Sequence, residues 1–113
     1  MRVLLATDGS EQSSHATKAV MSLTSVSTLT ILHVIDLPRL TFSMLGPEIA
    51  YDLSKVAEEA LRKDGEQALT RTKALLADKV EPVEIRLEEG SPAELILSVA
   101  QEEHPDFILM GAR

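Results

Sequence analysis

The stretch that decides the fold is residues 3–10, V-L-L-A-T-D-G-S, an unbroken apolar run that ends abruptly in an acid, a glycine and a serine. A run of valine and leucine without polar alternation is typical of a strand buried on both faces of a parallel sheet. This places Asp8 at the carboxyl end of the strand, where Gly9 permits a tight turn and Ser10 can cap a following helix. Ligands of open α/β sheets bind at that edge, so the same stretch predicts both a central strand and a ligand-facing position.

Outward from this stretch, the apolar residues switch repeatedly between helical and strand spacing. The alternation predicts right-handed crossovers and an open, mainly parallel sheet with helices on both faces, in a single α/β domain over residues 1–113. After the strand that ends at Asp8, the predicted elements are a helix over 11–25, a strand over 27–35, a helix over 48–79, a half-exposed edge strand over 83–89, a helix between Pro92 and His104, and a strand over 106–110.

The segment between the second strand and the second helix is a long crossover loop, punctuated by Pro38, Gly46 and Pro47. Its apolar content is unusual for a solvated loop, so we expect it either to pack over the sheet edge or to cover a ligand or partner surface. The helix that follows would be roughly 48 Å long, more than a small sheet can cover. We therefore expect a bend near Gly65 or an end that overhangs the sheet.

The sequence S-P-A-E at residues 91–94 predicts how the third helix begins. Ser91 and Glu94 have the spacing of a capping box, in which each side chain accepts a hydrogen bond from the backbone of the other. Pro92 suits the first helical position because its missing N–H would have no partner there.

The composition argues against several classes of function. A net charge of −7, with 11 basic residues among 18 acidic ones, argues against a nucleic-acid surface, and 3% aromatic residues argue against base-stacking platforms. The absence of cysteine excludes disulfides and thiolate catalysis. Neither a signal-peptide pattern nor a membrane-spanning apolar run is present, so a cytoplasmic protein that does not enter the membrane is the default expectation.

No catalytic or metal-binding constellation is legible in the sequence. The three histidines lack metal-site spacing, and the A-T-D-G-S turn matches neither the phosphate-binding P-loop nor the three-glycine dinucleotide fingerprint. His33 is predicted to be a core or face residue of its strand, and Asp36 to end that strand and open a turn. Taken alone, Asp8 is either a helix cap or a ligand-binding carboxylate.

Several segments, in order and over essentially the whole chain, resemble the universal stress protein family. They are the opening R-V-L-L-A-T-D-G-S, the second strand I-L-H-V-I-D, the long helix, the G-S-P-A-E-L-I cap and the closing P-D-F-I-L-M-G-A-R. The resemblance implies a Rossmann-like fold of the adenine nucleotide alpha hydrolase type, usually with five parallel strands in the order 3-2-1-4-5. It also implies a stress-response or signalling module that binds an adenine nucleotide such as ATP and is often a homodimer.

The same resemblance implies which residues line the adenine and ribose end of the site. Ala6, Thr7 and Asp8 would lie along it, Val34 would offer backbone groups to the base, and Met110 would pack beside the base. A carboxylate such as Asp8 can accept a hydrogen bond from a ribose hydroxyl or an exocyclic amine, which agrees with this assignment.

At the phosphate end, Gly111, Ala112 and Arg113 match the beginning of the segment that passes beneath the phosphates. Nucleotide-binding members continue with G-x-x-G, a later G-[ST] and a fifth strand, all of which follow Arg113 in the family pattern. Either those residues are missing from this sequence, or the domain is cut short. In the second case we expect weak triphosphate binding and an exposed apolar fourth strand prone to pair with another chain.

Three functions are therefore compared. The leading expectation is a stress-response module that binds an adenine nucleotide, with no catalytic residues and no metal. An interaction protein of the same fold that binds no nucleotide is the alternative, favoured by the missing phosphate loop and the apolar crossover. A receiver-like phosphoacceptor or a nucleotide hydrolase fits less well, because the first strand offers only Asp8 and no lysine follows Lys79.

Overall fold

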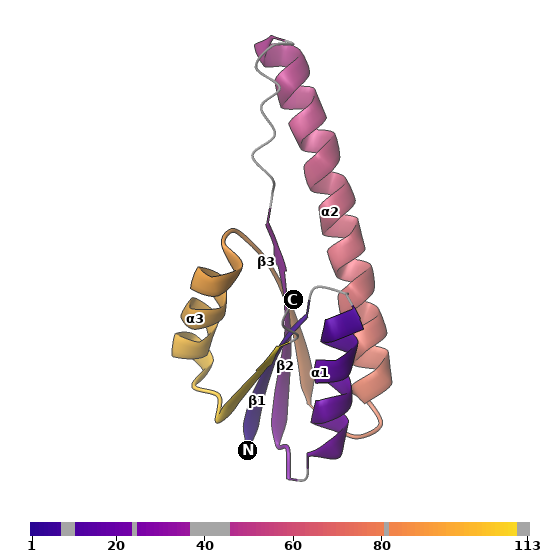
Figure 1. Ribbon diagram of the computed structural model, residues 1–113, viewed down its shortest axis with the longest axis vertical. Helices are drawn as coiled ribbons and strands as arrows, with labels where there is room; N and C mark the ends of the chain where they lie inside the picture. Colours follow the sequence, from indigo (N-terminus) through magenta and orange to yellow (C-terminus); the bar gives the residue numbers. More distant parts are fainter. Residues whose placement is uncertain (8–10, 24, 37–45, 81, 111–113) are drawn as a thin grey trace.

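The computed structural model describes residues 1–7, 11–23, 25–36, 46–80 and 82–110, which form an open α/β sheet (Figure 1). The described strands pair in parallel throughout and run in the order β3-β2-β1-β4. This confirms the predicted fold class. The elements are β1 (Arg2–Thr7), α1 (Glu11–Ser22), β2 (Thr28–Ile35), α2 (Pro47–Leu76), β3 (Val83–Glu89), α3 (Pro92–Glu103) and β4 (Phe107–Met110).

β1 lies inside the sheet with core on both of its faces. Leu4 and Leu5 point to opposite faces, and both are fully buried. Leu5 belongs to the cluster packed beneath α1 and α2, whereas Leu4 packs with Leu32 and with Val99 of α3. Figure 1 accordingly shows α1 and α2 on one side of the sheet and α3 on the other. Because burying one such side chain contributes about 1.5–3 kcal/mol, β1 stabilises both helical layers at once.

α2 is longer than the sheet that it covers. It runs without interruption over Pro47–Leu76, and its buried residues all lie between Gly65 and Leu76. In the first half, Ile49 is 53% exposed and Val56 is 64% exposed. This half projects beyond the carboxyl ends of the strands (Figure 1). The overhanging end that the length of the helix predicted is therefore present.

Gly65 marks a close approach of α2 to the sheet. A β-carbon at this position would lie 2.8 Å from Cδ2 of His33 and 2.8 Å from Cδ1 of Leu87. His33 is buried within β2, as predicted for a histidine in that strand. The helix can therefore lie this close to β2 and β3 only because Gly65 carries no side chain.

Three local predictions about helix ends are wrong. α2 ends at Leu76 rather than at residue 79. α1 ends at Ser22 rather than at residue 25, and Ser25 has a φ of 66°, in the left-handed region. Ser91 is the N-cap of α3, but its side chain makes no capping hydrogen bond, so the capping box does not form. The backbone of the first turn is regular, since the N–H of Leu95 donates to the carbonyl of Ser91 at 2.9 Å. The apolar part of the crossover loop, 37–45, lies outside the described residues.

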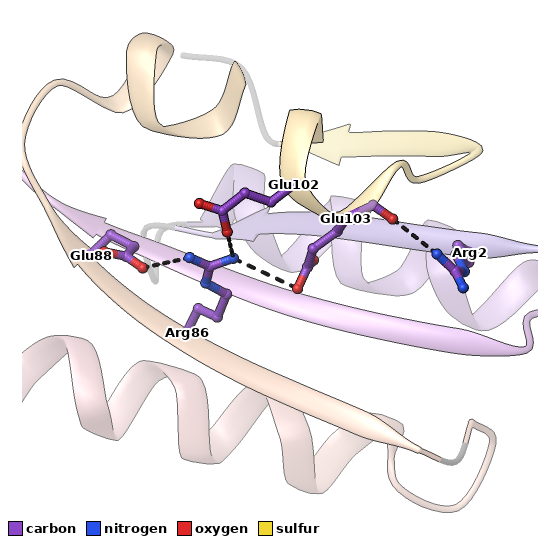
Figure 2. Close-up of polar contacts among 5 residues, drawn as sticks. All are labelled: Arg2, Arg86, Glu88, Glu102 and Glu103. Atoms are coloured by element: carbon purple, nitrogen blue, oxygen red, sulfur yellow. Dashed lines mark hydrogen bonds and ion pairs between the residues drawn. The ribbon is translucent and has the colours of Figure 1, made fainter. Parts of the chain in front are cut away.

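A cluster of charged side chains ties the end of α3 to β3 (Figure 2). Arg86 donates to Glu88 on its own strand and to Glu102 of α3, both at 2.9 Å, and Glu103 lies 3.7 Å away. The hydrogen bonds with Glu88 and then with Glu102 raise the pKa of Arg86 above its usual value. A raised pKa stabilises the folded chain at every pH below the pKa that the arginine has in the unfolded chain. The contribution of Arg86 to the free energy of unfolding is therefore constant across the ordinary pH range.

Replacing Gly65 by alanine should destabilise the protein. Alanine would gain about 1 kcal/mol as a helix former, but its methyl group would push against His33 and Leu87, which costs about 1–3 kcal/mol in a packed layer. Urea unfolding of Gly65→Ala should therefore show a net loss, whereas Glu66→Ala at the exposed neighbouring position should change stability by less than about 0.5 kcal/mol. A gain in stability for Gly65→Ala would show that α2 does not approach the sheet this closely.

Replacing Arg86 by glutamine should cost about 1 kcal/mol, because the carboxylates around it lose their shared cation and repel one another. The matched control is Arg62→Gln. Arg62 contacts Glu89 at 3.1 Å and Glu58 at 4.0 Å, but its side chain is 45% exposed against 25% for Arg86. Urea unfolding should show the smaller loss for the control, and 1 M NaCl should reduce both losses. Equal losses would contradict a special role for Arg86.

Candidate functional site

Parallel pairing brings the carboxyl ends of the described strands to one edge of the sheet, where open α/β proteins bind their ligands. At this edge, Thr7 of β1 pairs with His33 of β2, and this is the last pair of the described β1–β2 ladder. Ala6 pairs with Leu32 on one side and with Met110 of β4 on the other. The register therefore brings residues from three different strands together.

Three of the predicted site residues share one face of this edge. Side chains of paired residues in a parallel sheet point to the same face, so Ala6 and Met110 point the same way as Leu32, and Val34 follows two residues later. This is the face under α3, because Val34 packs on the cluster that includes Leu32 and Val99. Met110 is 50% exposed, whereas Ala6 is nearly buried. Ala6 and Met110 thus lie side by side, and Val34 lies on the same face two residues beyond Leu32, the partner of Ala6. We call these three residues the row, and Met110 is its accessible end.

The remaining predicted residues do not extend this row. Thr7 alternates to the opposite face, where its side chain is buried. Asp8 lies outside the described residues, and so do Gly111, Ala112 and Arg113. Their roles in ligand binding stay predictions.

A cleft of about 690 Å³ opens beside the carboxyl end of β2, within the size range of small-molecule sites. Val34 belongs both to the row and to this cleft, which continues along one ridge of α2. The described lining residues are His33, Val34, Ile35 and Asp36 of the β2 end, Leu61, Asp64, Gln67, Ala68 and Arg71 of α2, and Pro92 of α3.

The polar side chains of the cleft have mixed charge. Asp36 and Asp64 supply carboxylates that accept hydrogen bonds from hydroxyl and amino groups, and Gln67 can both donate and accept. Arg71 is exposed, and its guanidinium makes no hydrogen bond or ion pair with any described residue. It is therefore available to an anionic group. The arrangement suits a polar ligand rich in hydroxyl and amino groups that carries little net negative charge.

The α2 wall of this cleft is not predictable from the sequence. Leu61, Asp64, Ala68 and Arg71 follow one another at helical spacings of three and four residues, which a sequence displays openly. Which ridge of α2 faces the end of β2, however, depends on how the helix packs against the sheet at Gly65. That contact joins residues far apart in the chain and leaves no local signal.

Other parts of the described chain are weaker candidates for a ligand-binding site. A smaller hollow of about 220 Å³ lies at the amino edge of the sheet, around Arg2, Thr28 and Pro105, away from the ligand-binding edge. Within the described residues, no group of three or more histidine, cysteine or acidic side chains could hold a metal ion. No helix in the same residues is long and apolar enough to cross a membrane.

This chain is similar to a known protein family in sequence and to several solved structures in fold. The model of the universal stress protein family matches residues 1–113. No curated protein of similar sequence was found. The solved structure of the hypothetical protein MJ0577 is 25% identical with a TM-score of 0.77, and the match covers 99% of this chain and 74% of that one.

Two further structures extend this comparison. A protein of the universal stress protein family from Burkholderia pseudomallei is 27% identical with a TM-score of 0.72, over 98% of this chain and 80% of that one. A universal stress protein in complex with cAMP is 19% identical with a TM-score of 0.55, over 96% of this chain and 74% of that one. At 19% identity, the second likeness shows the fold alone.

Proposed function

This chain belongs to the universal stress protein family, and we propose that it binds an adenine nucleotide at the carboxyl edge of its sheet. The observation that carries the proposal is the row of Ala6, Val34 and Met110 on the α3 face of this edge. The cleft is walled by α2, which lies on the other face of the sheet, and it meets the row only at Val34. Half-exposed Met110 offers a polarizable apolar surface against which an adenine ring can pack. Val34 lies one residue past the last described β1–β2 pair, where the resemblance expects its backbone groups to meet the base.

The charges around the cleft favour a nucleotide with few phosphates. Asp36 and Asp64 can accept hydrogen bonds from ribose hydroxyls, and Arg71 can donate to one phosphate group. A universal stress protein with the same fold was solved in complex with cAMP, an adenine nucleotide with a single phosphate. We therefore expect the 113-residue chain to bind ATP only weakly, since two carboxylates oppose a polyanion there.

We also propose that the protein is cytoplasmic and forms a homodimer, as the family resemblance implies. Among the described residues of β4, Phe107 is 52% exposed and Ile108 is 41% exposed, and exposed apolar side chains support a contact with another copy. An interaction protein that binds no nucleotide remains the alternative function, favoured by the exposed apolar residues of α2.

Isothermal titration with cAMP, AMP and ATP tests the nucleotide proposal. The single-phosphate ligands should bind, and ATP should not reach low micromolar affinity. Asp8→Asn should weaken binding about tenfold or more, because a charged hydrogen-bond acceptor is lost. The matched control Asp78→Asn, at an exposed position beyond α2, should leave affinity unchanged. If none of the three ligands binds at millimolar concentration, the nucleotide proposal fails and the interaction protein is favoured.

Arg71 should act on the phosphate and not on the base. Arg71→Gln should weaken AMP binding about threefold to tenfold by removing a charge-assisted hydrogen bond, while adenosine binds the variant and the parent protein equally. The control Arg62→Gln changes another exposed arginine of α2 that lies outside the cleft lining. An equal loss for adenosine and AMP would place Arg71 away from the phosphate.

A further inference from the structure

The overhanging half of α2 carries a second apolar stripe, formed by Ile49, Leu53, Val56 and Ala60, which we call the outer stripe. Ile49 is 53%, Leu53 is 38% and Val56 is 64% exposed, and Ala60 is exposed as well. Contiguous exposed apolar side chains on a monomer surface mark an interaction site more often than isolated ones. Neither the row nor the cleft described above includes these residues.

The outer stripe does not face this protein's own sheet. At about 100° per residue, it lies roughly 140° around the helix axis from the sheet-facing residues. Those sheet-facing residues are Gly65, Ala68, Leu69, Thr72 and Leu76. Because Figure 1 shows this half of α2 beyond the strand ends, the sheet cannot cover the outer stripe without moving the helix. Packing in the core of this protein therefore does not explain why the outer stripe is apolar.

The spacing of the outer stripe is that of a helix–helix seam. Ile49, Leu53, Val56 and Ala60 are separated by four, three and four residues, the alternation of a and d positions in a heptad. α2 is continuous over Pro47–Leu76 and anchored on the sheet through its second half. The seam is therefore preformed, which lowers the entropic cost of docking another helix along it.

The flanks of the outer stripe are acidic on one side and small on the other. Asp52 and Glu59 lie along one side, and Ala50 and Ala57 along the other. Both carboxylates are exposed, and neither pairs with a cation among the described residues. Small flanking residues permit close approach of a second helix, and unpaired acids favour a partner with basic flanks.

These charges disfavour a second copy of the same helix as the occupant. An antiparallel pair of copies would bring Asp52 of one close to Glu59 of the other, and a parallel pair would bring Glu59 close to Asp64. Both arrangements juxtapose like charges. A net charge of −7 further favours association with a cationic partner.

We propose that the outer stripe of α2 is a docking site for a cationic amphipathic helix of a partner protein. The apolar face of that helix packs along Leu53 and Val56, and its lysine or arginine residues pair with Asp52 and Glu59. Because the overhang projects from the carboxyl edge, a docked partner lies on the same side of the molecule as the nucleotide site. The proposal does not depend on nucleotide binding.

Two synthetic three-heptad peptides test this docking site. Both have leucine at a and d, but one has lysine and the other glutamate at e and g, and binding to the full chain is measured by fluorescence anisotropy. The lysine peptide should bind at least about tenfold more tightly than the glutamate peptide. Val56→Glu should weaken its binding about tenfold or more, because it puts a charge into the seam. Leu75→Glu, at a position of α2 that is 61% exposed and outside the outer stripe, should change it by less than about twofold.

A charge reversal separates specific docking from damage to the fold. The double variant Asp52→Lys with Glu59→Lys should prefer the glutamate peptide, while its urea unfolding midpoint stays near that of the parent. The proposal is overturned if both peptides bind the parent equally, or if Leu75→Glu weakens binding as much as Val56→Glu does. It is also overturned if sedimentation shows a dimer that Val56→Glu converts to monomer, since a second copy would then occupy the stripe.

Discussion

Burial of β1 on both faces is the constraint on which the rest of this structure depends. Leu4 and Leu5 are neighbours in the chain, yet each is fully buried in a different core cluster. A strand can hold two layers only if both faces are covered, which requires helices on both sides and a parallel sheet built by crossovers. The position of β1 between β2 and β4 satisfies this requirement.

The candidate site is a consequence of the same packing. Once the core fixes the register of β1 against its neighbours, Ala6 comes to lie beside Met110 and one step from Val34. A shift of one residue in either ladder would turn these side chains to different faces. The membership of the chain in the universal stress protein family is consistent with a site at this edge, where the ends of β2, β1 and β4 lie side by side.

α2 performs two tasks because its two halves present apolar residues in different directions. The second half lies on the sheet at Gly65, and that contact turns the ridge of Asp64 and Arg71 toward the end of β2. The first half extends past the strands and carries its apolar residues away from them. A single rigid helix therefore forms one wall of the cleft and also offers a separate surface to a partner.

Apolar periodicity predicted the order of the elements, the burial of β1 on both faces and the overhang of α2, because periodicity is a local property of the chain. The sequence by itself also identified His33 as a core residue, and it predicts that ligands bind at the carboxyl edge. The resemblance to the family named Ala6, Val34 and Met110, but the spacing of those residues in the chain does not reveal that they share a face. Only the tertiary structure decided that, since facing follows from register across strands that are far apart in sequence.

The wall of the cleft and the exposure of the outer stripe were likewise decided by tertiary structure. Arg71 and Leu53 differ little in sequence context from other residues of a long amphipathic helix. Their surroundings depend on the position at which α2 packs against the sheet, which is set by Gly65. The side chain of Ser91 shows the reverse case, because a strong local motif is present in the sequence and yet forms no capping bond. The local sequence pattern determines whether a segment forms a helix or a strand, and long-range packing determines which residues that segment contacts.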